Sequence, residues 1–128
     1  MRSLLTEEVV IIDGQRPRDG VKLIPFITKR TDITPEQFQA HWRGQHADVV
    51  RHVGEQVRYV QNHVRLGIYR SGRTPAFDGV PMSWFISMDS LRASGQSPEF
   101  AAVKADEKHF LATSNIPFVI CREVEIIA

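Results

Sequence analysis

The sequence predicts an α+β fold whose main elements follow one another as β-α-β-β-α-β. Two observations carry this prediction: two stretches combine helix caps with helical spacing of apolar residues, and four stretches show strand composition between turn residues. We expect strands at 21–27, 57–65, 80–88 and 118–127, helices at about 34–53 and 97–112, and a short helical turn near 90–93. This order is that of the ferredoxin-like fold, a four-stranded antiparallel sheet with both helices on one face.

Composition places the chain among ordinary soluble domains. Its 128 residues fit one domain, with 42% hydrophobic and 24% charged residues. The formal net charge of +1 gives no electrostatic argument for nucleic acid or a membrane as partner. The single cysteine, Cys121, excludes an intramolecular disulfide and fits a reducing compartment. We therefore expect a cytoplasmic protein without a signal peptide or membrane span.

Residues 1–20 are predicted to be an N-terminal extension, and residues 21–128 the folded domain. The apolar run Val9–Ile12 is compatible with a short strand. The basic segment Arg16–Arg18 lies between turn signals, and we expect it to be a solvated arm. The stretch 66–79 contains three glycines and a proline, which predicts a long loop.

The first helix carries a histidine on its apolar face. Thr34 and Gln37 form a capping box at its start. Behind this cap, Phe38 and Trp42 recur at helical spacing, and His46 falls within the same face. Such a histidine is either a core residue with satisfied hydrogen bonds or an acid/base group that lines a cavity, since its ordinary pKa of about 6.5 suits proton transfer near neutrality.

The second helix carries a similar anomaly. Phe100 and Phe110 lie on its apolar face, Glu107 falls in the middle of that face, and Asp106 lies at its border. A carboxylate there either pairs with a buried cation or faces a wet cavity. If both helices cover one face of the sheet, Glu107 and His46 lie in the same layer, which favours a functional site.

The other face of the sheet has no helix to cover it. Its apolar residues would form a large exposed patch in a monomer. Burial of this face against a second sheet predicts a homodimer with two-fold symmetry.

Metal, phosphate and nucleophile signatures are missing from the sequence. His41, His46 and His52 are five and six residues apart, so they are not expected to stack on one helical face as the two ligands of an H-E-x-x-H motif would. There is no Gly-rich phosphate loop, and Cys121 is expected to be a small core residue. We therefore expect neither a metal nor a cofactor.

Four motifs occur in order along the chain. They are Phe38-x3-Trp42-x3-His46, Tyr59-Val60-Gln61-Asn62-His63, Phe77-Asp78-Gly79-Val80 leading into Trp84-Phe85, and Asp106-Glu107-x2-Phe110. Together they resemble the EthD family, within the dimeric α/β-barrel superfamily. The resemblance covers about residues 21–127.

This resemblance implies homodimers whose sheets pack back to back, with a ligand cavity between each sheet and its helices. It favours a cofactor-independent enzyme that transfers protons on a small apolar aromatic, polyketide-like or lactone substrate, by decarboxylation, dehydration or isomerisation. The alternatives are a cofactor-independent oxygenase using the same cavity, a non-catalytic binding or accessory protein for a small apolar compound, and a dimerisation module without a ligand.

On this hypothesis His46 is the general acid/base, and Glu107 orients it or tunes its pKa. Tyr59, Asn62 and His63 are candidates for hydrogen bonds to a substrate carbonyl or phenol. Because strand residues alternate between faces, Asn62 lies opposite Tyr59 and His63, so the three residues cannot all line one cavity.

Three more candidates for substrate binding have an ordinary structural explanation. Trp42 and Trp84 are expected to form cavity wall or core, since buried aromatic residues usually pack. Asp78 precedes a glycine, so it is either a turn residue or a functional one.

Overall fold

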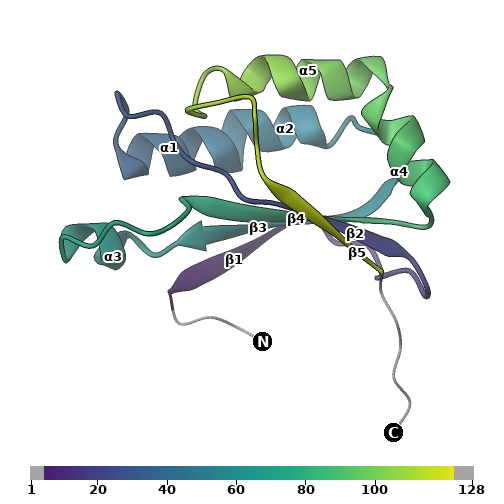
Figure 1. The fold of residues 1–128 in the computed structure, drawn as a ribbon, viewed down its shortest axis with the longest axis horizontal. Coiled ribbons are helices and arrows are strands. Elements are labelled where there is room, and N and C mark those ends of the chain that lie inside the picture. Colours follow the sequence, from purple (N-terminus) through teal and green to yellow (C-terminus); the bar gives the residue numbers. More distant parts are fainter. Residues whose placement is uncertain (1–4, 123–128) are drawn as a thin grey trace, which may run out of the picture.

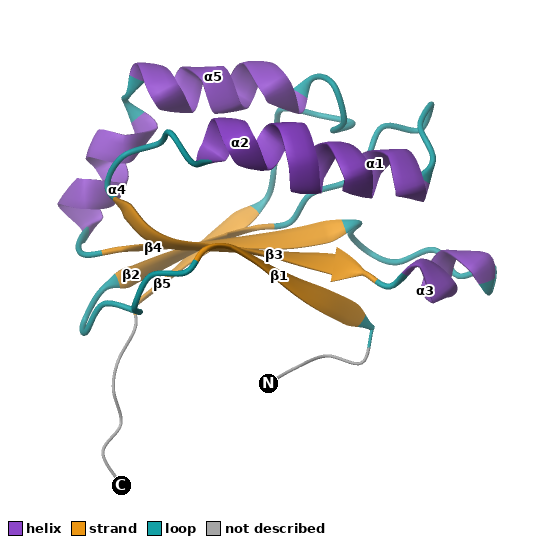
Figure 2. Ribbon diagram, turned by 180° about the vertical axis from the view of Figure 1, so that it is seen from behind, coloured by secondary structure: helices purple, strands orange, loops and turns teal. Residues whose placement is uncertain are grey.

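The computed structural model describes residues 5–122. An antiparallel sheet forms one layer, and the main helices lie together on one of its faces (Figures 1 and 2). The strand order is β1-β3-β4-β2-β5. The strands are β1 (Thr6–Ile12), β2 (Val21–Pro25), β3 (Gln56–Val64), β4 (Gly79–Phe85) and β5 (Phe118–Arg122). The ferredoxin-like arrangement is confirmed, but the sheet has five strands rather than the predicted four.

The additional strand, β1, comes from the predicted N-terminal extension. It pairs antiparallel with β3, from Thr6 opposite Val64 to Ile12 opposite Tyr59. Its apolar run explains this position, because Ile11 and Ile12 pack against the buried cluster between sheet and helices. The basic segment after β1 is not a free arm either. Arg16 is exposed, yet its guanidinium lies 5.5 Å from the ring centroid of Trp84.

The predicted first helix is present but contains a π-helical turn. It consists of α1 (Pro35–His41), the π-helix η1 (Trp42–His46) and α2 (Ala47–Val50). The capping box is confirmed, since Gln37 N donates to Thr34 Oγ1 at 3.1 Å and Thr34 N donates to Gln37 Oε1 at 2.9 Å. The π-helix lies where the sequence predicts regular α-helix.

The remaining helices are α3 (Leu66–Arg70), α4 (Met88–Gly95) and α5 (Pro98–Glu107). The prediction of a loop at 66–79 was wrong for its first part, because α3 forms there. Helix α5 begins at its predicted cap, Ser97, but ends earlier than predicted. The predicted end of the last strand, 123–127, lies outside the described residues. Cys121, predicted in the core, is exposed on β5.

The core lies between the sheet and the helices. One cluster consists of Ile27, Phe38, Trp42, Phe110 and Leu111, and a second of Val50, Val53, Tyr59 and Val103. Trp42 packs directly onto the backbone of β4, which requires glycine there. A Cβ at Gly79 would lie 2.5 Å from the indole of Trp42.

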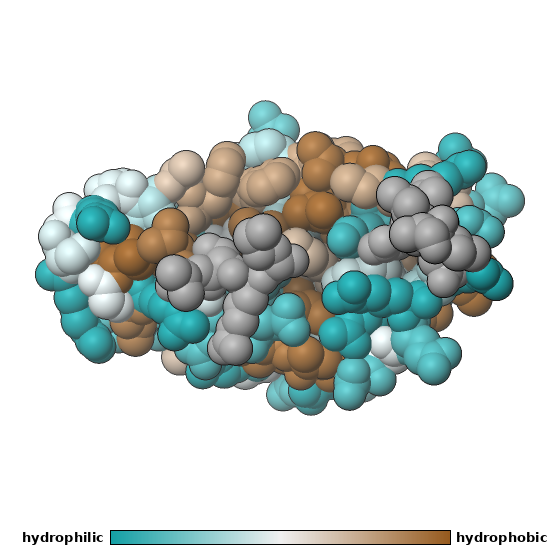
Figure 3. Space-filling model, turned by 90° about the horizontal axis from the view of Figure 1, so that it is seen from below, coloured by the Kyte–Doolittle hydropathy of each residue, from teal (hydrophilic) through white to brown (hydrophobic). Residues whose placement is uncertain are grey.

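The opposite sheet face carries no helix, and apolar residues gather on it (Figure 3). Val10, Val60 and Met82 are cross-strand neighbours in a row on this face. Val10 and Val119, on the two edge strands, are 40% and 45% exposed. Within residues 5–122, no helix has the length and apolar character needed to cross a membrane.

Candidate functional site

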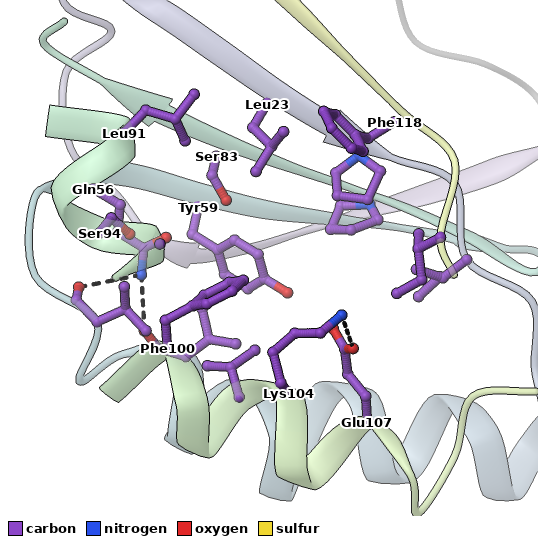
Figure 4. Close-up of a pocket in the computed structure, with 18 of the residues that line it drawn as sticks. Leu23, Gln56, Tyr59, Ser83, Leu91, Ser94, Phe100, Lys104, Glu107 and Phe118 are labelled. Carbon is purple, nitrogen blue, oxygen red and sulfur yellow. Dashed lines mark hydrogen bonds and ion pairs between the residues drawn. The ribbon is translucent and has the colours of Figure 1, made fainter. Parts of the chain in front are cut away.

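A cavity of about 550 Å³ lies between the sheet and helices α2, α4 and α5. Its volume falls in the range of small-molecule sites. Most of its wall is apolar, and it also contains His46, Tyr59, Lys104 and Glu107. In Figure 4 the Tyr59 hydroxyl and the Lys104–Glu107 pair approach the same hollow from the sheet and from α5. Polar groups from the sheet and from α5 therefore face one largely apolar hollow.

His46 reaches this cavity from the last residue of the π-helix. It is 5% exposed and its ring packs against Phe110, with 4.6 Å between ring centroids. Its Nδ1 lies 2.7 Å from Oδ2 of Asp106 on α5. Within residues 5–122, Nε2 of His46 makes no hydrogen bond, so a carboxylate holds one ring nitrogen and the other is unpartnered in a residue that lines the cavity.

Asp106 holds a second histidine on the same oxygen atom. Nε2 of His41 lies 2.9 Å from Asp106 Oδ2. Residues five apart diverge by about 140° on a regular α-helix. The π-helix, whose hydrogen bonds span five residues, brings His41 and His46 to the same side. The expectation that these two histidines do not share a face was therefore wrong, because it assumed regular α-helical spacing.

The charge states follow from burial and from these contacts. Burial lowers the pKa of His46 more than the hydrogen bond and charge of Asp106 raise it, so the ring is neutral near pH 7. Burial alone would raise the pKa of Asp106. The hydrogen bonds and charges of His41 and His46 lower this pKa by more than burial raises it, so the net shift is downward. An ionised carboxylate only accepts hydrogen bonds. His46 therefore carries its proton on Nδ1, and Nε2 is a free base.

Glu107 lines the cavity but has a different partner from the one predicted. Its Oε1 lies 2.6 Å from Nζ of Lys104, one turn away on α5. Burial raises its pKa, the hydrogen bond and charge of Lys104 lower it, and the charge of Asp106 raises it, with a net upward shift. The carboxylate that contacts His46 is Asp106, because adjacent residues on α5 point about 100° apart. Glu107 thus both pairs with a cation and faces the cavity.

Tyr59 contributes a polar group from the sheet to the cavity. It is buried on β3, and its hydroxyl accepts a hydrogen bond from Nε2 of Gln61 at 3.3 Å. Burial raises the pKa of Tyr59 to about 12, despite the opposing hydrogen bonds of Gln61 and Trp42. The phenol is therefore protonated and can donate a hydrogen bond to a ligand.

The other β3 candidates do not line the cavity. His63 shares the helix-facing side with Tyr59, as the alternation predicts, but lies beneath Trp42 with 4.3 Å between ring centroids. Burial lowers its pKa to about 3, and Nε2 donates to Oε1 of Gln61 at 2.8 Å. Asn62 lies on the other face, where Nδ2 donates to the Val80 carbonyl at 3.0 Å.

The remaining candidates have separate positions. Trp42 lines the cavity. Asp78 lies outside it and accepts hydrogen bonds from Lys29 N at 2.8 Å and from the Tyr69 hydroxyl at 2.6 Å. Both contacts are distant in sequence, so Asp78 links β4 to the segment after β2 and to α3 rather than forming a local Asx turn. Trp84 belongs to the opposite sheet face and lies outside the cavity lining.

Sequence reasoning missed that His41 belongs to the site and that Asp106 contacts both His41 and His46. The Asp106-Glu107 pair was a signal that a carboxylate faces the site, but which one does so depends on how far α5 is rotated. Among residues 5–122, no group of three histidine, cysteine, aspartate or glutamate side chains is arranged to hold a metal ion.

The fold and the cavity define a ferredoxin-like protein with a ligand-sized space between sheet and helices. The family model described as the EthD domain matches residues 30–114. The chain therefore belongs to the EthD family.

Solved structures of low sequence identity share this fold. An EthD-family protein from Bacillus halodurans has a TM-score of 0.65 and 19% identity, over 82% of this chain and 99% of that one. A hydroxynitrile lyase from Passiflora edulis has a TM-score of 0.63 and 15% identity, over 88% and 100%. SnoaB, a cofactor-independent oxygenase from Streptomyces nogalater, has a TM-score of 0.59 and 13% identity, over 85% and 97%. No curated protein matches the chain significantly in sequence.

Proposed function

We propose that this protein is a cofactor-independent enzyme that transfers a proton on a small, largely apolar compound bearing a carbonyl or a phenol. The observation that carries the proposal is the state of His46: Asp106 holds Nδ1, and Nε2 is a free base at a ligand-sized cavity. Most buried polar atoms in proteins are hydrogen-bonded, so an unpartnered nitrogen on a residue that lines a cavity favours a role toward a ligand.

The proposed roles follow from the protonation states. His46 Nε2 takes a proton from a carbon or oxygen next to the substrate carbonyl. Tyr59 donates a hydrogen bond to the oxygen on which negative charge develops. His46, now protonated on both nitrogens, returns the proton at another position, which completes an isomerisation. In a dehydration, His46 returns the proton to the departing hydroxyl group, which leaves as water. In a decarboxylation, His46 takes the proton of the carboxylic acid, carbon dioxide leaves, and His46 returns the proton to the carbon.

Asp106 supports this cycle by stabilising the imidazolium that forms on His46. Glu107 is a second acid/base candidate, because its pKa is raised and Lys104 keeps it at the cavity wall. Enzymes that handle such chemistry use groups whose environments move their pKa values apart. The SnoaB structure is that of a cofactor-independent oxygenase with this fold, the hydroxynitrile lyase structure is that of a lyase with this fold, and neither carries an argument about the reaction of this protein.

We also propose that two copies associate through the sheet face that has no helix. Val10 and Val119 are exposed on this face and Met82 is half-buried, which gives it apolar surface that a second sheet would bury, whereas Val60 between Val10 and Met82 is already buried. The ligand cavity lies on the other side of the sheet, so dimerisation leaves it accessible.

The test is proton exchange on carbon, which requires no knowledge of the overall reaction. The protein is incubated in D₂O with a panel of 1,3-diketones, aryl ketones, hydroxylated aromatic acids and lactones, and loss of the acidic C–H signal is followed by proton NMR. We expect exchange above the buffer rate for at least one class. His46→Gln should reduce that rate by about 10²–10⁴-fold.

The matched control is His52→Gln, which changes an exposed histidine just after α2. It should exchange at the wild-type rate. A folded His46→Gln variant that keeps full exchange activity contradicts the proposal. An oxygenase would instead consume dissolved oxygen with the same compounds, and a binding protein would bind them without exchange and independently of His46.

A further inference from the structure

Gln61 is a fully buried polar residue whose amide contacts both the backbone of the π-helix that carries His46 and the hydroxyl of Tyr59. It is 0% exposed and lies on β3 beneath the π-helix. A buried amide is costly unless its hydrogen bonds are made. Its Nε2 donates to the Trp42 carbonyl at 2.8 Å and to the Tyr59 hydroxyl at 3.3 Å, and its Oε1 accepts from His63 at 2.8 Å.

The hydrogen bond from Gln61 to Trp42 is made to the backbone carbonyl of the first residue of the π-helix. The backbone N–H of Ala47 donates to this same carbonyl, five residues back along the chain. In a regular α-helix that carbonyl would instead receive the N–H of His46. A carbonyl oxygen has two lone pairs. Here one is used by the wide backbone turn and the other by Gln61, so the amide stabilises the turn that presents His46 to Asp106.

The bond to Tyr59 directs the phenol. Because its oxygen accepts from Gln61, the hydroxyl proton of Tyr59 is free to point elsewhere, and the side chain lies in the cavity wall. Gln61 thus keeps the phenol as a hydrogen-bond donor toward a ligand.

His63 fixes the orientation of the amide. Burial keeps His63 neutral, with a pKa of about 3, so its tautomer is determined by the N–H that it donates to Oε1 of Gln61. With Oε1 occupied in this way, both amide protons are directed at Trp42 and Tyr59.

We propose that Gln61 is a positioning residue that sets the geometry of His46 and Tyr59 together, with His63 holding its amide in place. Neither Gln61 nor His63 touches the cavity, so both act through other residues. The catalytic consequence rests on the proposed function, whereas the structural coupling does not.

The experiment reads the tautomer of His46 by ¹⁵N NMR of the imidazole ring, without any substrate. In the wild type we expect the proton on Nδ1. Gln61→Met keeps the volume of the side chain but removes both donors, and we expect loss of the Nδ1-protonated form. Gln39→Met is the matched control, because Gln39 is also a buried glutamine whose Nε2 donates to a backbone carbonyl, that of Val64, at 2.6 Å. That variant should keep the wild-type tautomer.

An unchanged His46 tautomer in folded Gln61→Met overturns the proposal. A second measurement uses the wild type alone. The side-chain amide protons of Gln61 should exchange with solvent at least about 10²-fold more slowly than those of the exposed Gln45. Equal exchange rates also overturn the proposal. Because neither measurement requires turnover, failure of the proposed function would leave both outcomes interpretable.

Discussion

Gly79→Ala tests the contact that seats the π-helix on the sheet. The added Cβ would lie 2.5 Å from Cζ3 and 2.7 Å from Cη2 of Trp42, about 1 Å closer than ordinary van der Waals contact. Trp42 cannot move outward freely, since it is 1% exposed and packs on Phe38 and His63. The strand cannot shift freely either, because Gly79 exchanges backbone hydrogen bonds with Ile27.

The expected cost follows from overpacking, which destabilises by about 1–3 kcal/mol. An unfolding entropy of about 2.1 cal/mol/K per residue gives about 0.27 kcal/mol/K for 128 residues. The melting temperature should therefore fall by about 4–11 °C, as measured by circular dichroism with urea unfolding as a second probe.

Gly54→Ala is the matched control, because a Cβ at Gly54 would meet no atom within 4 Å. Its stability should stay within about 0.5 kcal/mol of the wild type. If Gly79→Ala melts at the same temperature as Gly54→Ala, Trp42 does not pack on β4 as described, and the seating of the π-helix must be reconsidered.

Three further predictions concern buried titratable groups and the uncovered sheet face. The pKa of His63 is about 3 in the fold and about 6.5 when unfolded, so the unfolded chain binds an extra proton between these values. Lowering the pH from 7 to 5 should therefore cost about 2 kcal/mol of stability through His63, as measured by urea unfolding. His63→Phe should remove this contribution and leave that of His46, whose pKa is also lowered. Asp106→Asn should destabilise the fold by about 1.5–3 kcal/mol at pH 7. The pKa of Asp106 is lowered in the fold, so its carboxylate contributes stability at pH values above the pKa that it has in the unfolded chain. In the same variant the pKa of His46, measured by NMR titration, should fall further because the charge of Asp106 no longer raises it. An unchanged His46 titration would contradict the assigned contact. Met82→Lys should convert the proposed dimer into a folded monomer by light scattering, and a persisting dimer would place the interface elsewhere.

Much of the fold could be predicted because local signals and tertiary structure agree. The capping box of Thr34 and Gln37 fixes where the first helix begins, and Ser97 does the same for α5. The strand alternation correctly separates Tyr59 and His63 from Asn62. Where signals were weak, the tertiary structure decided: β1 joins the sheet because its apolar residues can be buried against the core, although its sequence alone resembles an extension.

The site was harder to predict because it depends on a departure from regular geometry. Helical periodicity places His46 on the buried face, which the structure confirms. It cannot show that a π-helix brings His41 beside it, since periodicity contains no information on long-range contacts such as the hydrogen bond from Gln61 on β3 to the Trp42 carbonyl. The same uncertainty in rotation made Glu107, rather than Asp106, the predicted partner of His46.

Strands β1 and β5 form the two edges of the sheet, and both lie outside the segment by which the family is recognised. The segment that matches the EthD domain, residues 30–114, contains only β3 and β4 of the five strands. Strand β2, an interior strand that pairs with both β4 and β5, lies before it. The stretch recognised by sequence contains His46, Tyr59, Asp106 and Glu107, whereas the cooperative unit that must fold is larger. A fragment cut at the boundaries of the match would keep only β3 and β4 and would lose β2 together with both edge strands.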